Sequence, residues 1–267
     1  MPIARINGHD MNYEIHGTGE PVLLMGGWGT FCHGEHHHLP WGLTDRYSVV
    51  IFDHRGIGDS GDELDKPATT RMYADDAIGL LSHLDIPNAH VIGLIGMGAC
   101  IAQEMAISHP QLVRSMVNTG AWLKTDRFLT DQLELFRNIH RDMGFLAFQH
   151  AVTVLSFEPE YYNRNIDRLL GVDGVWGHLN GRYPAHSRLI DACIAHDTTG
   201  RAGQIKAPTF VLHAGLDQVT GPRTTQPIQD AIPGAEGYLL AEAAHVIAGK
   251  AMKARFSELL FDFLGKH

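Results

Sequence analysis

The segment from Ala89 to Ala106 constrains the fold of this chain more than any other part of the sequence. It begins with apolar residues that favour a β-strand, passes through Gly93, Gly96 and Gly98, and continues into good helix formers. This order of residue types predicts a strand, a tight turn and a helix. In an open α/β sheet such turns lie at the carboxyl ends of the strands, where ligands bind. We therefore expect a site around residues 93–98, which we call the elbow.

Other segments predict a sheet around this unit. Pro21–Met25 and Tyr47–Phe52 are continuous apolar runs, which are typical of strands buried on both faces of a parallel sheet. Val113–Trp122 and Pro208–Ala214 are expected to be later strands of the same sheet. Near the amino end, Asn7-Gly8 separates two short alternating segments and predicts a hairpin. The expected fold class is α/β, with a mostly parallel central sheet.

Helical patterns alternate with these strands. The segment Thr69–Leu84 has an apolar stripe at helical spacing, and Thr70 is its expected N-cap. Further helices are expected over Thr224–Ile232 and Val246–Leu264, separated by a strand over Gly237–Leu240. Helices between parallel strands cover both faces of such a sheet.

From Leu123 to Ile205 the alternation of strands and helices stops. This segment predicts several helices that carry many aromatic residues. An all-helical insertion between two strands of an α/β sheet is typical of a cap over the carboxyl edge. We therefore predict an α/β core formed by residues 1–122 and 206–267, and a helical cap formed by residues 123–205.

Composition narrows the class of partner. The chain has 267 residues, a formal net charge of −9 and no block of positive charge, which argues against nucleic acid or an anionic membrane surface. No apolar run approaches the roughly 18 residues of a membrane span, and no signal-peptide pattern is present. The three cysteines are an odd number without C-x-x-C spacing, which favours reduced thiols. We expect a cytoplasmic protein with a small-molecule substrate and no cofactor, and a homodimer stays open.

Several motifs together resemble the α/β-hydrolase fold family. These are the elbow, the segment Asp53–Ser60 (DHRGIGDS), Ala214-Gly-Leu-Asp217 and Ala244-His245. In that family a nucleophile, an acid and a histidine follow one another along the chain. The resemblance implies that Asp217 is the acid and His245 the histidine.

The chain departs from the family at the nucleophile, which is usually the serine of G-x-S-x-G. Aligning backwards from Gly98 places Gly96 in the serine position, whereas aligning forwards from Gly93 places Ile95 there. Neither residue is a nucleophile. The oxyanion hole of this family uses backbone N–H groups, and the resemblance implies one donor from the elbow, Met97 or Gly96, and Trp28 as the other.

Candidate pocket residues come from the resemblance and from aromatic residues near the predicted edge. They are Gly27, His33, His36, Trp122 and Trp176. The histidine-rich segment His33–His38 also raises the possibility of a transition-metal site, but consecutive histidines cannot all face one ion and Gly34 interrupts a helix. We predict no metal.

Two classes of function follow. The first is an enzyme, which resembles small capped hydrolases such as aminoacrylate hydrolases and enol-lactonases. In it, His245 with Asp217 serves as a general base that activates water, and no acyl-enzyme forms. Lyase or cofactor-independent oxygenase chemistry on the same scaffold is the alternative. The second class is a binding protein on an inactive hydrolase scaffold.

Overall fold

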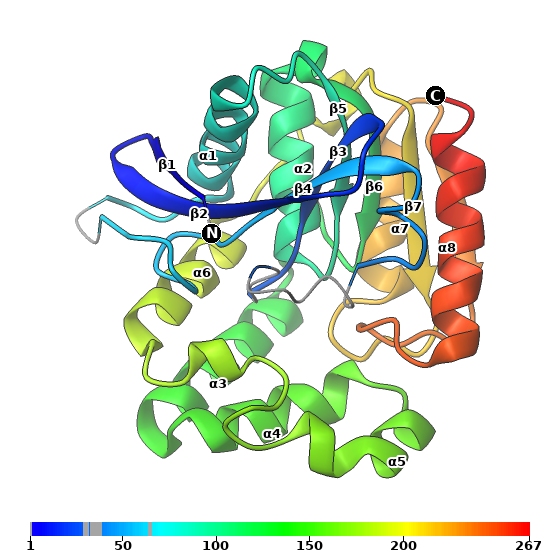
Figure 1. The fold of residues 1–267 in the computed structure, drawn as a ribbon. Helices are drawn as coiled ribbons and strands as arrows, with labels where there is room; N and C mark the ends of the chain where they lie inside the picture. Colours follow the sequence, from blue (N-terminus) through cyan, green and yellow to red (C-terminus); the bar gives the residue numbers. More distant parts are fainter. Residues whose placement is uncertain (1, 29–31, 33–38, 64–65) are drawn as a thin grey trace.

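The computed structural model describes residues 2–28, 32, 39–63 and 66–267. It contains a sheet of eight strands in the order β1-β2-β4-β3-β5-β6-β7-β8 (Figure 1). The pairs β1–β2 and β2–β4 are antiparallel, and all later pairs are parallel, which confirms the predicted α/β class. The strands are β1 (Ile3–Ile6), β2 (His9–His16), β3 (Glu20–Met25), β4 (Tyr47–Phe52), β5 (Ala89–Gly93), β6 (Val113–Thr119), β7 (Thr209–Ala214) and β8 (Glu236–Leu240).

Helices cover both faces of this sheet. Successive side chains of a strand point to opposite faces, and β3 shows the division clearly. Leu23 and Met25 belong to a buried cluster with α1 and α2, whereas Val22 and Leu24 belong to a second cluster with α8. The α-helices are α1 (Thr70–His83), α2 (Met97–Ser108), α3 (Arg127–Met143), α4 (Phe145–Ser156), α5 (Pro159–Leu169), α6 (Tyr183–Ala195), α7 (Pro222–Ala231) and α8 (Lys250–Leu264).

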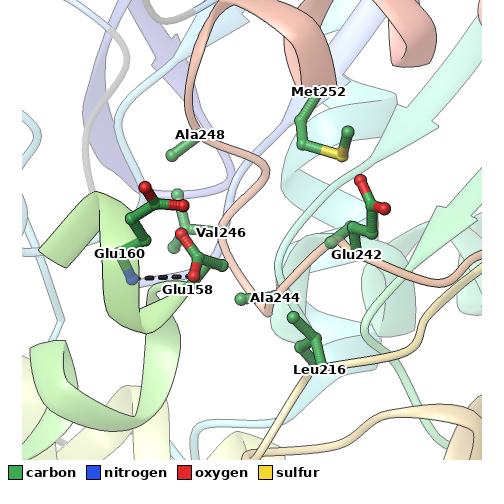
Figure 2. Close-up of a pocket in the computed structure, with 9 residues that line it drawn as sticks. Glu158, Glu160, Leu216, Glu242, Ala244, Val246, Ala248 and Met252 are labelled. Atoms are coloured by element: carbon green, nitrogen blue, oxygen red, sulfur yellow. Dashed lines mark hydrogen bonds between the residues drawn. The ribbon is translucent and has the colours of Figure 1, made fainter.

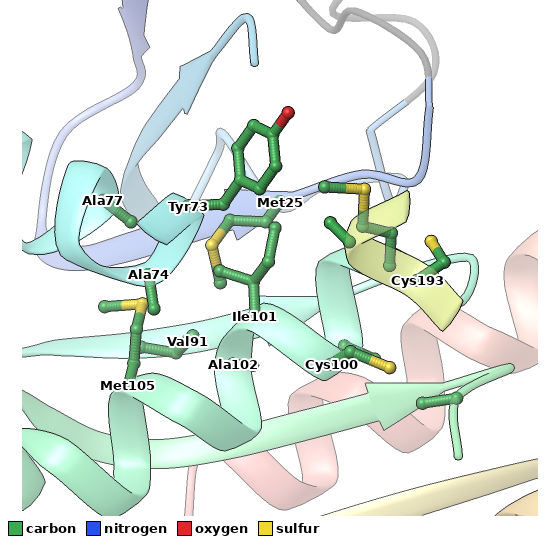
Figure 3. Close-up of a cluster of buried hydrophobic side chains, with 14 of the residues drawn as sticks. Met25, Tyr73, Ala74, Ala77, Val91, Cys100, Ile101, Ala102, Met105 and Cys193 are labelled. Carbon is green, nitrogen blue, oxygen red and sulfur yellow. The ribbon is translucent and has the colours of Figure 1, made fainter. Parts of the chain in front are cut away.

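The cluster on the α1 and α2 face continues into the inserted helices. Figure 3 shows Met25 and Tyr73 packed near Ile101 of α2, with Cys193 of α6 beside them. Cys100 and Cys193 are both buried, and burial raises the pKa of the Cys193 thiol to about 12. These thiols therefore act as small apolar packing groups.

Between β6 and β7 the chain forms α3 to α6, which lie together at the edge of the sheet where the parallel strands end (Figure 1). The backbone N–H of Val246 donates to the carbonyl of Ser156 at the end of α4, over 2.9 Å. Arg188 of α6 donates to the Asp62 carboxylate over 2.9 Å. This arrangement agrees with a cap, although the boundaries at residues 123 and 205 stay a prediction.

Three predicted helix starts differ from the structure, and one of them is that of α7, which begins at Pro222 and not at Thr224. Thr69, not Thr70, is the N-cap of α1, because its extended backbone lets its hydroxyl accept from the N–H of Met72. The last helix begins at Lys250, not at Val246, since Gly249 has a φ of +82° and lies just before the helix. Among the described helices, none combines the length and apolar character that a membrane crossing requires.

Candidate active site

A small cavity lies at the carboxyl ends of the central strands, beneath the inserted helices. Its volume is about 40 Å³, which holds a few water molecules because one water needs roughly 10–15 Å³ on this scale. It is lined by Trp28, Ile95, Gly96, Met97, Trp122, Leu133, Phe136, Val152, Ser156, Trp176, Cys193, Val219 and His245. Seven of these residues are among the candidates from the sequence, so the fold brings segments distant in the chain to one cavity.

His245 lines this cavity, whereas Asp217 does not; we call the two residues the acid–histidine pair. Nδ1 of His245 lies 2.8 Å from Oδ2 of Asp217. The loop after β7 positions the carboxylate, because Oδ1 accepts from the N–H groups of Val219 and Thr220, each over 2.8 Å. The Thr220 hydroxyl donates to Oδ2 over 2.7 Å. The carboxylate is therefore held by four hydrogen bonds.

The charge state of this pair follows from its surroundings. Burial opposes ionisation of Asp217, but the charge and hydrogen bond of His245 and the donors of Thr220 outweigh it and hold the pKa of Asp217 well below its usual range. An ionised carboxylate only accepts hydrogen bonds. Nδ1 of His245 must therefore carry the proton that it donates to Asp217. In the neutral imidazole this leaves Nε2 as the basic nitrogen.

The elbow contains two consecutive residues with positive φ. Ile95 has a φ of +54° and Gly96 a φ of +71°, and α2 begins directly after them. A β-branched residue with positive φ is a conformational outlier, and such outliers concentrate at functional sites. The N–H of Gly96 donates to the carbonyl of Thr119 over 3.2 Å, which fixes the turn against β6. A side chain at Gly98 would collide with the carbonyl of Met25.

No hydroxyl or thiol is carried by the elbow. A Cβ atom built at Gly96 would lie 3.1 Å from Cζ3 of Trp122, so the indole covers this position. A Cβ atom built at Gly120, which follows β6, would lie 3.1 Å from Cε1 of His245. Glycines at both positions therefore allow Trp122 and His245 to approach the elbow closely.

The candidate oxyanion donors lie on either side of this space. Met97 is the first residue of α2, whose N-terminal N–H groups lack partners within the helix. Trp28 follows β3, and its ring packs against Phe136 and His186 of the inserted helices. The turn after β3, which carries Trp28, is held by His54, whose Nε2 donates to the carbonyl of Gly26 over 3.1 Å. Burial lowers the pKa of His54, which keeps this donor neutral.

The remaining sequence candidates differ in how they are placed. Trp122 and Trp176 line the cavity, whereas Gly27 packs against the elbow, since a Cβ there would lie 2.6 Å from the carbonyl oxygen of Ile95. His33 and His36 lie outside the described residues. Within the described part of the chain, no group of three or more histidine, cysteine, aspartate or glutamate side chains is arranged to hold a metal ion.

Sequence reasoning missed the cavity residues that come from the inserted helices. These are Leu133, Phe136, Val152, Ser156 and Cys193, together with Val219 from the loop after β7. The helical periodicity of the insertion indicates which faces are apolar, but it does not indicate which of those faces meets the elbow. Ser156 carries no sequence signal of its own.

A second, larger hollow of about 360 Å³ borders the loop that carries His245. Figure 2 shows Glu158, Glu160 and Glu242 around it, with Met252 of α8 at one end. Glu158 is already engaged as the N-cap of α5. The hollow is lined by neither Asp217 nor His245, so the smaller cavity is the better candidate for the reaction.

Comparison with known proteins agrees with this geometry. A family model of the alpha/beta hydrolase fold matches residues 20–249. The chain is 29% identical to a putative carbamate hydrolase RutD of Azorhizobium caulinodans, covering 100% of this chain and 99% of that protein. It is 28% identical to a putative non-heme bromoperoxidase BpoC of Mycobacterium tuberculosis, over 89% of this chain and 91% of that protein.

Solved structures share the fold. The enol-lactonase from Burkholderia xenovorans LB400 matches with a TM-score of 0.87 and 22% identity, covering 99% of this chain and all of that one. The family model spans most of the chain and includes the strands from β3 to β8. This chain therefore belongs to the α/β-hydrolase fold family, and the prediction of an enzyme of this fold is confirmed.

Proposed function

We propose that this protein hydrolyses a small carbonyl compound by direct attack of water, without an acyl-enzyme. The observation that carries the proposal is the arrangement of the cavity. His245, held by an ionised Asp217, lines the same small space as Gly96, which offers no nucleophilic atom. A general base next to a cavity that has room for water favours activation of a water molecule.

The reaction would run in two steps. Nε2 of His245 takes a proton from water as the water oxygen attacks the carbonyl carbon. The negative charge that develops on the carbonyl oxygen is stabilised by the backbone N–H groups of Met97 and Trp28. Asp217 keeps the imidazole oriented and stabilises it while it carries the proton. His245 then returns the proton to the leaving group as the tetrahedral intermediate collapses.

Two features of the elbow favour water over a covalent step. Gly96 directly precedes α2, so we assign it, rather than Ile95, to the position of the usual nucleophile. The indole of Trp122 lies against this position, which leaves little room for a side chain there. A fixed water between His245 and the backbone donors needs no such side chain.

The named relatives support the coarse substrate class. One relative is named for a carbamate and one solved structure for an enol-lactone, and both are carbonyl compounds. We further propose that this is a cytoplasmic enzyme of small-metabolite catabolism.

The test is a panel of small neutral substrates, namely p-nitrophenyl acetate, γ-butyrolactone and methyl carbamate, assayed for product and for dioxygen uptake. The proposal expects hydrolysis of at least one compound without dioxygen consumption, and loss of that activity in His245→Ala. Dioxygen uptake with substrate loss would favour the oxygenase alternative. Saturable binding without any turnover would favour the binding-protein alternative.

A further inference from the structure

Two buried polar groups in the cavity have no hydrogen-bond partner among the described residues. They are Nε1 of Trp122 and Oγ of Ser156. The two side chains are nearly or fully buried, with 3% and 0% of the residue exposed. Buried polar groups are normally paired, and each exception calls for an explanation such as a ligand or water. Both residues line the cavity that contains His245.

The two residues that carry these groups come from different parts of the fold. Trp122 follows β6 in the core, and its six-membered ring lies over Gly96, with Cζ3 nearest. Nε1 belongs to the five-membered ring, on the side of the indole away from Cζ3. Ser156 ends α4, and its carbonyl accepts from Val246, the residue after His245. The carbonyl of Trp122 accepts from Nε2 of Gln103 over 3.2 Å, so hydrogen bonds to the backbone hold both residues at the cavity that contains His245.

The chemistry of the two groups indicates their partner. The indole N–H only donates hydrogen bonds, and a serine hydroxyl donates or accepts, so an oxygen atom satisfies both. The residues that line the cavity include no lysine or arginine among those described. A carboxylate would therefore be buried without a cationic partner, which is unfavourable. The matching group is an uncharged oxygen, as in a ketone, ester or amide.

Ser156 has a binding role in this arrangement, not a nucleophilic one. A serine nucleophile needs a base within hydrogen-bond reach. In the described part of the chain, the Ser156 hydroxyl makes no hydrogen bond to His245. Its backbone carbonyl, and not its hydroxyl, contacts the loop that carries His245, by accepting from the N–H of Val246.

We propose that Trp122 and Ser156 form a subsite for a second, uncharged oxygen of the substrate. The substrate class is then a small neutral compound in which a second carbonyl lies close to the reacting one. The identity of the reacting carbonyl rests on the proposed function, whereas the subsite rests on the two unpartnered groups.

The first test compares methyl acetoacetate with methyl butanoate, which differ by exchange of a second carbonyl for a methylene group. The ratio of their kcat/KM values should fall about tenfold in Ser156→Ala and in Trp122→Phe, because each change removes one donor to the second carbonyl. Ser257→Ala is the control, since this buried serine of α8 also has an unpartnered hydroxyl but does not line the cavity. An unchanged ratio in both cavity variants would overturn the subsite.

Charge is tested in the same series with monomethyl malonate, which carries a carboxylate in place of the ketone. The proposal expects kcat/KM at least about tenfold below that of methyl acetoacetate, because the anion would be buried without a counter-ion. A preference for the malonate ester would contradict an uncharged partner.

A second readout does not depend on turnover. In ¹⁵N-labelled His245→Ala, the indole N–H resonance of Trp122 can be assigned with Trp122→Phe among the four tryptophans. Methyl acetoacetate should move this resonance downfield, whereas methyl butanoate should not. Equal shifts would mean that only water meets the indole, and would overturn the subsite. A selective shift without turnover of either ester by the wild-type protein would refute the proposed hydrolysis and support the subsite.

Discussion

His245 of the acid–histidine pair and three residues of the elbow line the same cavity, yet the pair and the elbow are built in opposite ways. Asp217 accepts four hydrogen bonds and holds His245 in one tautomer. The elbow offers only backbone and apolar side chains, with Gly96 in the position next to α2. In the proposed mechanism, the pair that would move protons is therefore preorganised, whereas the elbow carries no atom that could form a covalent bond. Water is the simplest replacement for the missing atom.

Removal of the base should have the largest effect. We expect His245→Ala to lower kcat/KM for the best substrate of the panel by about 10² to 10⁴, the usual contribution of general-base catalysis. Steady-state kinetics measures this, with circular dichroism to show that the fold is intact. His109→Ala at the end of α2 is the matched control, because His109 does not line the cavity and should leave kcat/KM within about twofold. Full activity of His245→Ala would end the base assignment.

Adding a side chain at Gly96 should lower the activity less than removal of His245, but the loss should still be large. In Gly96→Ser the new Cβ would lie 3.1 Å from Trp122 at a residue with positive φ, so the indole or the backbone must shift. Misplacement of a reacting group by ~1 Å can cost ~10² in rate, so native activity should fall by about that factor and no strong ester burst should appear. Gly96→Ala separates the steric effect from the hydroxyl. A proficient burst-phase esterase in Gly96→Ser alone would mean that only the oxygen is missing from an intact elbow.

A smaller loss of activity is expected from a side chain at Gly120, which lies against His245. Gly120→Ala would place a methyl group 3.1 to 3.2 Å from the His245 ring, and should lower kcat/KM about tenfold by displacing the imidazole. Gly181→Ala carries a similar backbone penalty, because Gly181 also has positive φ, but its methyl group would meet nothing within 4 Å. If both variants lose activity equally, the contact between Gly120 and His245 has no role in positioning the base.

The smallest effect is expected from a change of pH, through the ionisation of Asp217. Because the pKa of Asp217 lies well below its usual range in the folded protein, this carboxylate stays ionised from neutral pH down to about pH 4. The stability that it contributes is present above the unfolded-state pKa and is lost only as the pH falls through the lower folded-state value. Between pH 5 and 8, urea unfolding should therefore show the same difference in free energy of unfolding between the wild-type protein and Asp217→Asn. A difference that shrinks within this range would show that Asp217 titrates there.

Much of the fold was predictable because it follows from local patterns. Continuous apolar runs such as Tyr47–Phe52 identify strands buried on both faces, and Asn7-Gly8 identifies the hairpin. Helix ends were less predictable. Two adjacent threonines, Thr69 and Thr70, are both good caps by composition, and only the backbone conformation decides between them.

The site was predictable only where chain order carries information. The order of the elbow, Asp217 and His245 identifies the positions of the pair, because each follows the end of a strand. The contribution of the inserted helices was not predictable. Ser156 reaches the cavity through the packing of α4 and its backbone contact with Val246, which no local pattern encodes.

The central claim is that no covalent bond forms between enzyme and substrate. Rapid-quench mass spectrometry of the intact wild-type protein during turnover of an ester from the panel tests it most directly. We predict that no acyl group accumulates on the protein and that product release begins without a burst. A stoichiometric acyl adduct on any residue from Leu94 to Gly98 that appears and decays with turnover would contradict direct attack by water.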